Sequence, residues 1–346
     1  MRAVCTFLAA AALTACSGGG DTNDGGTDAS DAFVVDELTA LDCMCPDVAP
    51  PKTITVLNAK GTALASFFAD QAGNSAPYAV VTGNLTNLSG AIAVAADGQH
   101  NLYVATQLAL LVFPQGSNGN VAPARTIAGT NALANTDVFA GITVASDGTI
   151  YAAAELASGT TRSPKIEVFA PNANGNVAPV RTIGGASSTM TAVLSMASTA
   201  SQIAVADASQ YALFFDAQAN GDVPPQRSIK TTAGLAVQIA LGVAADVWIA
   251  DWNFSTSSAV HWATGAVGTT PPDGSIAGPS TKITAIGGIA VDIDATYVVN
   301  ADPAGPSILT YPGNTTGDVP PIRQISGAST TLSGDASQGP MPLVVY

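Results

Sequence analysis

Charged residues are scarce in this sequence. Only 10% of its 346 residues are Asp, Glu, Lys or Arg, against roughly 25% in an ordinary soluble domain. A helical bundle needs charged, unbranched residues on its exposed faces, and the 34 Gly and 21 Pro would interrupt long helices repeatedly. The composition therefore excludes a bundle, and a hydrophobic content of 47% excludes a disordered chain.

Basic and histidine side chains are rarer still. Eleven Lys and Arg stand against 25 Asp and Glu, which gives a net charge of −14 at pH 7. Because clustered basic residues bind nucleic acids through counterion release, we predict no nucleic-acid partner. His100 and His261 are the only histidines and lie in no H-E-x-x-H or Ser-His-Asp pattern, so we expect packing or surface positions for both.

The sequence also lacks an apolar run of the length that spans a membrane, which is about 20 residues. Its N-terminus has Arg2, a shorter apolar stretch and then Leu13-Thr14-Ala15-Cys16, a pattern typical of an export signal. The segment from Leu13 to Cys16 resembles the lipobox of bacterial lipoproteins. The resemblance implies that residues 1–15 are a cleaved lipoprotein signal peptide, that Cys16 is lipidated, and that its acyl chains attach the protein to a membrane.

Residues 16–50 are interpreted as the lipidated cysteine followed by a flexible tether. Gly, Ser, Thr, Asp and Asn dominate its first half, and none of them contributes to a core. The tether contains a Cys-Met-Cys motif formed by Cys43, Met44 and Cys45. In an oxidising envelope Cys43 and Cys45 form a local disulfide or stay a pair of thiols, and a soft metal such as Cu(I) is a further alternative.

One sequence unit recurs through residues 51–346. Its best copies are Gly-Asn-Val-Ala-Pro-Ala-Arg-Thr-Ile at 119–127 and Gly-Asn-Val-Ala-Pro-Val-Arg-Thr-Ile at 175–183. Further copies occur at 221–229 and 317–325, with weaker ones around Pro77 and Pro272. The aligned prolines, at 77, 123, 179, 225, 272 and 321, are 46 to 56 residues apart. Six copies therefore account for the whole of this segment.

Each unit contains short apolar segments separated by turns. The first segments are 91–94, 141–144, 238–241 and 288–291. The second are 102–105, 150–153, 203–206, 247–250 and 297–299, and the third are 110–113, 166–169, 213–215, 260–262 and 308–311. The proline-bearing segment is the fourth strand, and we expect it at the outer edge because proline donates no ladder hydrogen bond.

Four antiparallel strands in each unit of 40 to 50 residues predict an all-β fold, a six-bladed β-propeller. The strand order and the Gly-Ile-Ala-Val and Tyr-Val-Ala segments resemble NHL-repeat propellers. The chain begins its repeats with a segment at 54–57 that resembles a third strand, and it ends on 341–346, which no further strand follows. We expect the C-terminal segment to supply the inner strand of the blade that residues 54–81 begin, so that N- and C-terminal strands close the ring.

Four arginines occupy the same place in the repeat. They are Arg125, Arg181, Arg227 and Arg323. Repetition favours an architectural role, so we expect their stems to pack between blades while the guanidinium groups meet carbonyls or a carboxylate.

Polar side chains follow the second strand of several units. They are Thr106, Glu155, Asp207, Asp251 and Asn300. A ring of carboxylate and amide oxygens around a central funnel resembles the site in which gluconolactonase-like propellers hold a divalent metal. The resemblance implies Ca²⁺ or Mg²⁺ bound by Glu155, Asp207, Asp251 and Asn300. The alternative is that these residues cap strand ends by accepting hydrogen bonds from nearby backbone.

The resemblance to bacterial lipoproteins thus implies a lipid-anchored protein of the bacterial cell envelope, and by the sorting rule of Gram-negative lipoproteins Ser17 after the lipidated cysteine implies the outer membrane. Its propeller is expected to be a non-enzymatic binding or interaction module without a cofactor, and its partner an unidentified protein or carbohydrate. The alternative is a metal-dependent hydrolase or lactonase of the gluconolactonase-like type, which needs Ca²⁺ or another divalent metal.

Overall fold

The computed structural model describes residues 51–346 apart from 59–60, 135, 157–161, 232–233, 253–255 and 335–339. The predicted signal peptide, Cys16, Cys43 and Cys45 lie outside the described residues. The segment Pro50–Tyr346 forms one compact unit. Within the part that the structure describes, no helix has the length and apolar character needed to cross a membrane.

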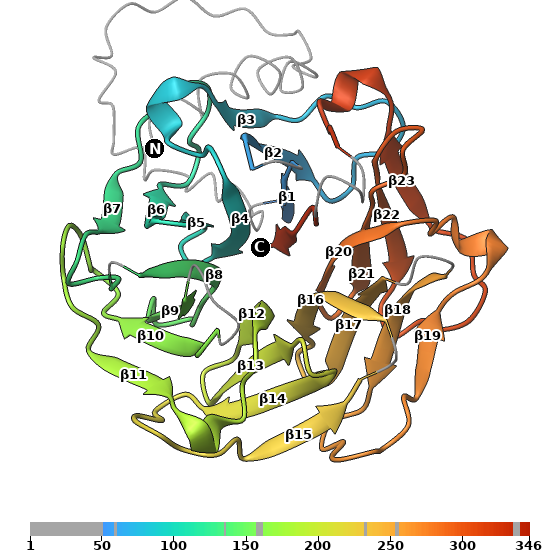
Figure 1. The fold of residues 1–346 in the computed structure, drawn as a ribbon. Coiled ribbons are helices and arrows are strands. Elements are labelled where there is room, and N and C mark those ends of the chain that lie inside the picture. Colours follow the sequence, from blue (N-terminus) through green and yellow to red (C-terminus); the bar gives the residue numbers. More distant parts are fainter. Residues whose placement is uncertain are drawn as a thin grey trace, which may run out of the picture. The chain divides into compact units, whose positions relative to one another are not determined.

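Six four-stranded antiparallel sheets, the blades, are arranged in a ring (Figure 1). From the centre outwards, blade 1 contains β24 (Leu343–Val345), β1 (Thr53–Leu57), β2 (Ala63–Phe68) and β3 (Ala79–Thr82). Blade 2 contains β4 (Ala91–Ala96), β5 (Leu102–Thr106), β6 (Ala109–Phe113) and β7 (Arg125–Ala128). Blade 3 contains β8 (Asp137–Val144), β9 (Ile150–Leu156), β10 (Lys165–Phe169) and β11 (Arg181–Gly184).

The second half of the ring repeats this order. Blade 4 contains β12 (Val193–Ser198), β13 (Gln202–Asp207), β14 (Tyr211–Asp216) and β15 (Arg227–Lys230). Blade 5 contains β16 (Leu235–Leu241), β17 (Val247–Trp252), β18 (Ser257–Trp262) and β19 (Gly274–Ile276). Blade 6 contains β20 (Ile286–Val291), β21 (Ala295–Asn300), β22 (Ser307–Pro312) and β23 (Arg323–Ser326).

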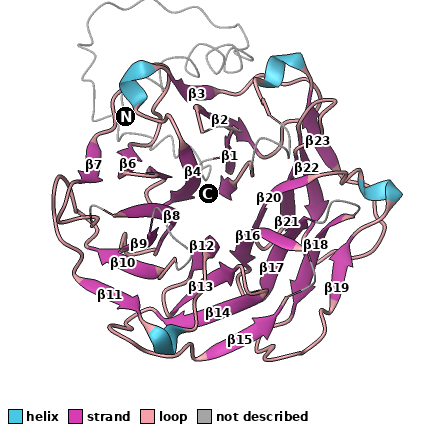
Figure 2. Ribbon diagram, viewed as in Figure 1, coloured by secondary structure: helices cyan, strands magenta, loops and turns pink. Residues whose placement is uncertain are grey.

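Short 3-10 turns lie between some outer strands and the next inner strand, as Figure 2 shows at the periphery of the ring. They are η1 (Asn84–Thr86), η2 (Ala186–Ser188), η3 (Pro279–Thr281) and η4 (Ala328–Thr330). The six four-stranded blades confirm the six-bladed β-propeller predicted from the repeat.

Both faces of each blade are buried, which explains the near-continuous apolar runs in the sequence. In β13, Ile203 and Val205 pack into the cluster shared with blade 3, while Ala204 and Ala206 pack into the cluster shared with blade 5. Side chains alternate between the two faces of a strand. In this strand the small residues face one neighbouring blade and the large residues the other, and the core of the protein consists of the layers between successive blades.

The ring is closed by β24, which pairs with β1 in the register Ile54↔Val345, Thr55↔Val344 and Val56↔Leu343. Thr53 and Tyr346 exchange both backbone hydrogen bonds, at 2.7 and 3.0 Å. In Figure 1 the C-terminus lies at the centre of the ring beside β1 and β4. The predicted closure, in which the C-terminal segment supplies the inner strand of blade 1, is confirmed. The assignment of 54–57 as a third strand is wrong, because β24 adds one strand and not two inside β1, which makes β1 the second strand of its blade.

The proline-bearing segments form the outermost strands, as expected, but the prolines themselves stand before the strands. Pro123, Pro179 and Pro225 each precede by two residues the first residue of an outer strand. A proline in the loop removes no hydrogen bond from the ladder.

The outer strands are not free edges, because each pairs in parallel with a glycine of the next repeat. These bridges are Val81–Gly119, Ile127–Gly175, Ile183–Gly221, Ile229–Gly268, Ile276–Gly317 and Ile325–Gly73. We call each such contact a clasp. At one clasp, Gly175 N donates to Thr126 O at 2.7 Å and Ala128 N donates to Gly175 O at 3.2 Å. The last clasp joins blade 6 to blade 1 and closes the ring a second time.

Candidate functional site

The strand register locates the polar residues predicted to form a ring. Thr106, Asp207, Asp251 and Asn300 hold the same place in their blades, opposite the inner-strand residue that precedes a bulge. In blade 3 that place belongs to Ala154, which pairs with Phe139 just before the bulge. Glu155 is therefore displaced from the ring by one residue, and a shift of one residue turns a strand side chain to the opposite face.

Asp207 binds the loop that leads into the inner strand of its own blade. Its carboxylate accepts hydrogen bonds from Thr191 N at 2.8 Å, Thr191 Oγ1 at 2.6 Å and Ala192 N at 3.1 Å. It also accepts hydrogen bonds from Ser209 N at 2.9 Å and Ser209 Oγ at 2.5 Å. The side chain is buried, so these five donors replace the water that the charged form would otherwise require.

Asn300 does the same in blade 6. Its Oδ1 accepts hydrogen bonds from Thr284 N at 2.8 Å and Ala285 N at 2.9 Å. Asn58 was missed in the sequence, yet it follows directly after β1, the second strand of blade 1, and Ser333 N donates to its Oδ1 at 3.2 Å. These contacts match the capping alternative, and the signal that reveals Asn58 is its place directly after the apolar run of β1.

Glu155 and Asp251 have different surroundings. Arg162 Nη1 donates to Glu155 Oε1, while Glu155 Oε2 is buried and has no hydrogen-bond partner among the described residues. Asp251 lies against Gly234, where an added β-carbon would come within 1.8 Å of Asp251 Oδ1. Among the described residues no three His, Cys, Asp or Glu side chains gather in a way that holds a metal ion. The divalent-metal ring stays a prediction, and the geometry of the described residues adds no support for it.

A cavity of about 210 Å³ lies at the centre of the ring and is lined by all six inner strands. Gln238 links three of these strands. Its Nε2 donates to Leu343 O at 2.8 Å, and its Oε1 accepts hydrogen bonds from Ile289 N at 3.0 Å and Leu343 N at 3.2 Å. Gly288 permits this approach, because a β-carbon there would lie 2.7 Å from Gln238 Oε1. The side chain thus ties the closing strand β24 to blades 5 and 6.

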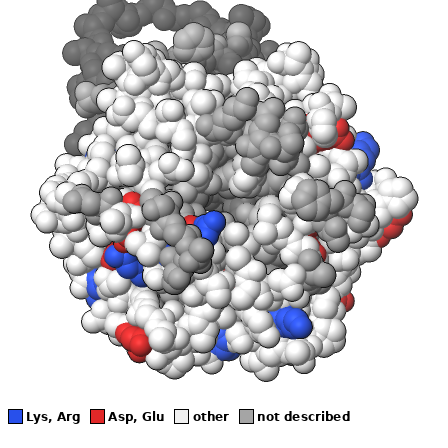
Figure 3. Space-filling view, in the orientation of Figure 1, with Lys and Arg blue, Asp and Glu red and all other residues white. Residues whose placement is uncertain are grey.

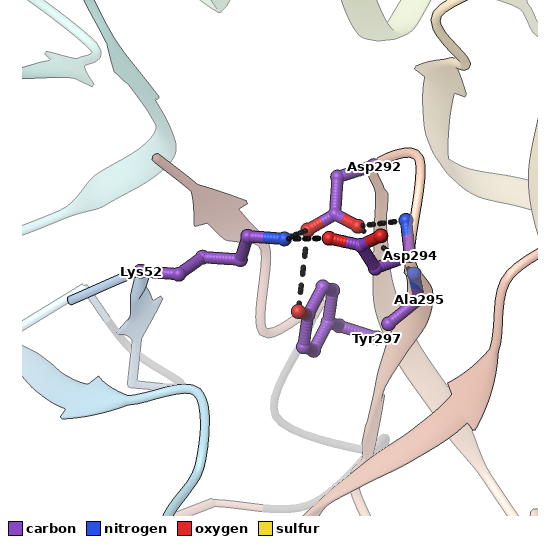
Figure 4. Close-up of polar contacts among 5 residues, drawn as sticks. All are labelled: Lys52, Asp292, Asp294, Ala295 and Tyr297. Atoms are coloured by element: carbon purple, nitrogen blue, oxygen red, sulfur yellow. Dashed lines mark hydrogen bonds and ion pairs between the residues drawn. The ribbon is translucent and has the colours of Figure 1, made fainter. Parts of the chain in front are cut away.

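The seam between blades 1 and 6 carries a group of charges that stands out in a molecule with few. Uncharged side chains make up most of the face seen in Figure 3. At the seam, Lys52 Nζ lies 2.7 Å from Asp292 Oδ2 and 3.0 Å from Asp294 Oδ2, and Tyr297 OH donates to Asp292 at 3.2 Å (Figure 4). Lys52 precedes β1 of blade 1, and both aspartates lie in the turn between β20 and β21 of blade 6. The contact therefore links the first blade to the last.

The electrostatics of this group favour the charged forms. Burial lowers the pKa of Lys52, but hydrogen bonds to Asp292 and Asp294 outweigh it and raise the pKa to about 12. Burial raises the pKa of Asp292, yet hydrogen bonds from Lys52 and from the backbone of Asp294 and Ala295 hold it below its usual value. Burial and the charge of Asp292 raise the pKa of Tyr297 to about 12, so Tyr297 keeps its proton as a donor.

A pocket of about 440 Å³ opens beside this group, lined by residues that include Lys52, Asp70, Asp294, Tyr297 and Arg323. We call it the seam pocket. Its volume lies in the range of roughly 300 to 1,000 Å³ typical of small-molecule sites. The seam pocket could not be predicted from the sequence, because its walls come from opposite ends of the repeat array.

The ring of six clasped blades defines the protein as a six-bladed β-propeller. No family model matches the chain, and no curated protein matches it. Solved structures do. A protein of unknown function from Bacteroides caccae superposes with a TM-score of 0.60 at 8% sequence identity, covering 86% of this chain and 99% of that chain.

Two further solved structures resemble the chain less closely. The β-propeller domain of Cps50 (Swd1) from Myceliophteria thermophila has a TM-score of 0.47 at 12% identity, covering 81% of this chain and 87% of that chain. The WD40 β-propeller domain of Doa1 has a TM-score of 0.43 at 11% identity, covering 71% of this chain and 86% of that chain. At such identities the likeness shows the fold alone.

Proposed function

We propose that this protein is a lipid-anchored binding module of the bacterial cell envelope. The observation that carries the binding role is the use of Asp207 and Asn300, whose oxygens are engaged by the loops entering the inner strands. Loops held in this way present a preorganised surface, which lowers the entropic cost of binding. Oxygens saturated by backbone donors are also poor metal ligands, which favours binding over metal-dependent hydrolysis.

The anchoring part of the proposal rests on the lipobox-like segment that ends at Cys16. Two or three acyl chains give stable attachment, whereas one chain gives only marginal attachment. The polar tether of residues 17–50 would place the propeller at a distance from the membrane. The proposed location is the outer membrane, on the basis of Ser17 after the lipidated cysteine.

Labelled fatty acid fed to expressing cells tests the anchor. We expect label in the wild-type chain and in the Cys43→Ser control, and none in Cys16→Ala, which should leave the membrane fraction. A Cys16→Ala chain that still carried label or stayed in the membrane fraction would overturn the anchoring proposal.

A thermal-shift screen of sugars, short peptides and divalent ions tests the binding role. A ligand that binds only the folded form raises the melting temperature. We expect at least one sugar or peptide to do so without being consumed. Turnover of a lactone or ester, with no stabilisation by any sugar or peptide, would contradict the proposal.

One observation favours the second candidate, a metal-dependent hydrolase. Glu155 Oε2 is buried with no hydrogen-bond partner in the part of the chain that the structure describes, and a cation there would satisfy it. If this candidate holds, Ca²⁺ raises the melting temperature of the wild type and the shift is lost in Glu155→Gln.

A further inference from the structure

In three blades the repeated arginine donates hydrogen bonds to the neighbouring blade. Arg125 Nη1 donates to Pro171 O at 2.7 Å and to Ala173 O at 3.1 Å, both in the next blade. Arg181 likewise donates to Ala219 O at 2.7 Å and to Ala217 O at 3.0 Å. Each guanidinium therefore bridges two blades, as the repeat predicted.

Arg227 follows the same rule. Its Nη1 donates to Ala266 O of the next blade at 2.9 Å, and its guanidinium lies 3.6 Å from the centroid of the Phe214 ring. Carbonyl acceptors and an aromatic face together account for its charge. The expectation that these arginines pack between blades is confirmed for Arg125, Arg181 and Arg227.

Arg323 breaks the pattern at the seam. It begins β23 in the place that corresponds to the other three, but its side chain is exposed and makes no hydrogen bond or ion pair within the residues that the structure describes. It lines the seam pocket. Since the architecture does not use this guanidinium, it is available to a ligand.

The other charges of the seam pocket divide into used and unused groups. The Lys52 ammonium is held by Asp292 and Asp294, so its charge is balanced inside the protein. Asp70 is exposed and, like Arg323, has no hydrogen bond or ion pair among the described residues. The pocket thus offers one unpaired cation and one unpaired carboxylate.

The remaining wall is apolar. Ile322, with 54% of its surface exposed, lines the pocket together with Ala69 and Ala295. A guanidinium binds a carboxylate through two parallel hydrogen bonds, and a carboxylate accepts hydrogen bonds from an ammonium group. A ligand that matches all three features carries both a carboxylate and an ammonium group on a small, partly apolar body.

We propose that the seam pocket binds a small zwitterion, a free amino acid or a short peptide, with its carboxylate on Arg323 and its ammonium group on Asp70. This inference rests on the proposed binding function and names its ligand class. The Lys52–Asp292 pair and Tyr297 act as positioning residues, since they fix the wall formed by the turn between β20 and β21.

Titration calorimetry on the full chain tests the proposal. The probes are a panel of dipeptides with apolar and polar side chains, including alanyl-alanine, together with the N-acetylated and C-amidated forms of each. We expect the wild type to bind at least one unmodified dipeptide and to bind both of its modified forms at least about tenfold more weakly, because each lost charge-assisted contact is worth roughly one decade or more.

Two variants and one matched control assign the contacts. Arg323→Gln should weaken the unmodified dipeptide about tenfold and leave the C-amidated form unchanged, while Asp70→Asn should do the same with respect to the N-acetylated form. Lys230→Gln removes an equally exposed positive charge from β15 and should change neither affinity. Arg323 makes no contact that folding requires, so we expect the melting temperature of Arg323→Gln to match that of the control.

The outcomes separate this inference from the binding function. If no dipeptide binds, or if Arg323→Gln binds the unmodified form as tightly as the wild type, the seam assignment is overturned. Stabilisation by a sugar under the same conditions would show that the protein still binds a ligand elsewhere. If neither dipeptides nor any other screened compound binds, both proposals fall.

Discussion

Gln238 offers the sharpest test of how the ring holds together. Replacement by Leu keeps the volume but removes the donor and the acceptor that link β16, β20 and β24. Three backbone groups, Ile289 N, Leu343 N and Leu343 O, lose a partner, and both residues are buried.

The expected magnitude follows from these three groups. A buried polar group left without a partner costs about 1 to 3 kcal/mol. The adjacent cavity of about 210 Å³ has room for water that replaces part of the lost bonding. We therefore expect Gln238→Leu to lower the free energy of unfolding by about 3 kcal/mol, near the lower end of the sum. In a propeller of this size that is a fall of about 5 °C in the melting temperature.

Urea denaturation of the two purified proteins measures this difference. Gln226→Leu is the matched control, because Gln226 is exposed and, among the residues that the structure describes, its side chain bonds only to Asp216. We expect the control to change stability by less than about 0.5 kcal/mol. Equal, small losses in both variants would refute the claim that Gln238 ties the closing strand to its neighbours.

Three further predictions concern the clasps, the strand caps and the seam. Gly185→Ala should destabilise the protein by at least about 1 kcal/mol in thermal denaturation, because Gly185 has φ 125° and an added β-carbon would lie 2.5 Å from the carboxyl carbon of Asp222, which follows the clasp glycine Gly221. Asp207→Ala should cost about 3 kcal/mol through its lost hydrogen bonds, with faster amide exchange in the loop before β12 but not in blade 1. Asp292, with a lowered pKa, adds stability above its unfolded pKa of 3.8 that is lost as the pH falls through its lower folded value. Lys52, with a raised pKa, adds stability below 10.5 that is lost as the pH rises through about 12. Lys52→Met should therefore flatten both limbs of a plot of melting temperature against pH, and unchanged limbs would contradict the pairing.

The sequence contained enough to predict the blade number and the closure, because both follow from repetition. The spacing of the aligned prolines sets the number of units, and the unpartnered strands at the two ends leave only one way to complete blade 1. Three arginines are also placed correctly, since a residue repeated with the clasp motif serves the contact between blades.

The site was less accessible to sequence reasoning. Glu155 was assigned to the ring, but Ala154 occupies that place, and only the pairing with Phe139 reveals the difference of one residue. Whether Arg323 is bonded depends on which acceptor groups blade 1 places beside it, and the sequence around Arg323 does not show this. Nothing in the sequence around Gln238 distinguishes it from other strand residues, because its partner strand β24 lies far away in the chain.

A disulfide across the closing pair tests the account most directly. Ile54 and Val345 are Cα partners in β1 and β24, and they flank the hydrogen-bonded pair Thr53–Tyr346, so they form a close, non-hydrogen-bonded pair suited to a disulfide. In a background with Cys43→Ser and Cys45→Ser, we expect Ile54→Cys combined with Val345→Cys to oxidise within one chain, giving a single linked peptide by mass spectrometry. Free thiols at both positions under oxidising conditions, or links only between different chains, would contradict closure of the propeller by its own C-terminus.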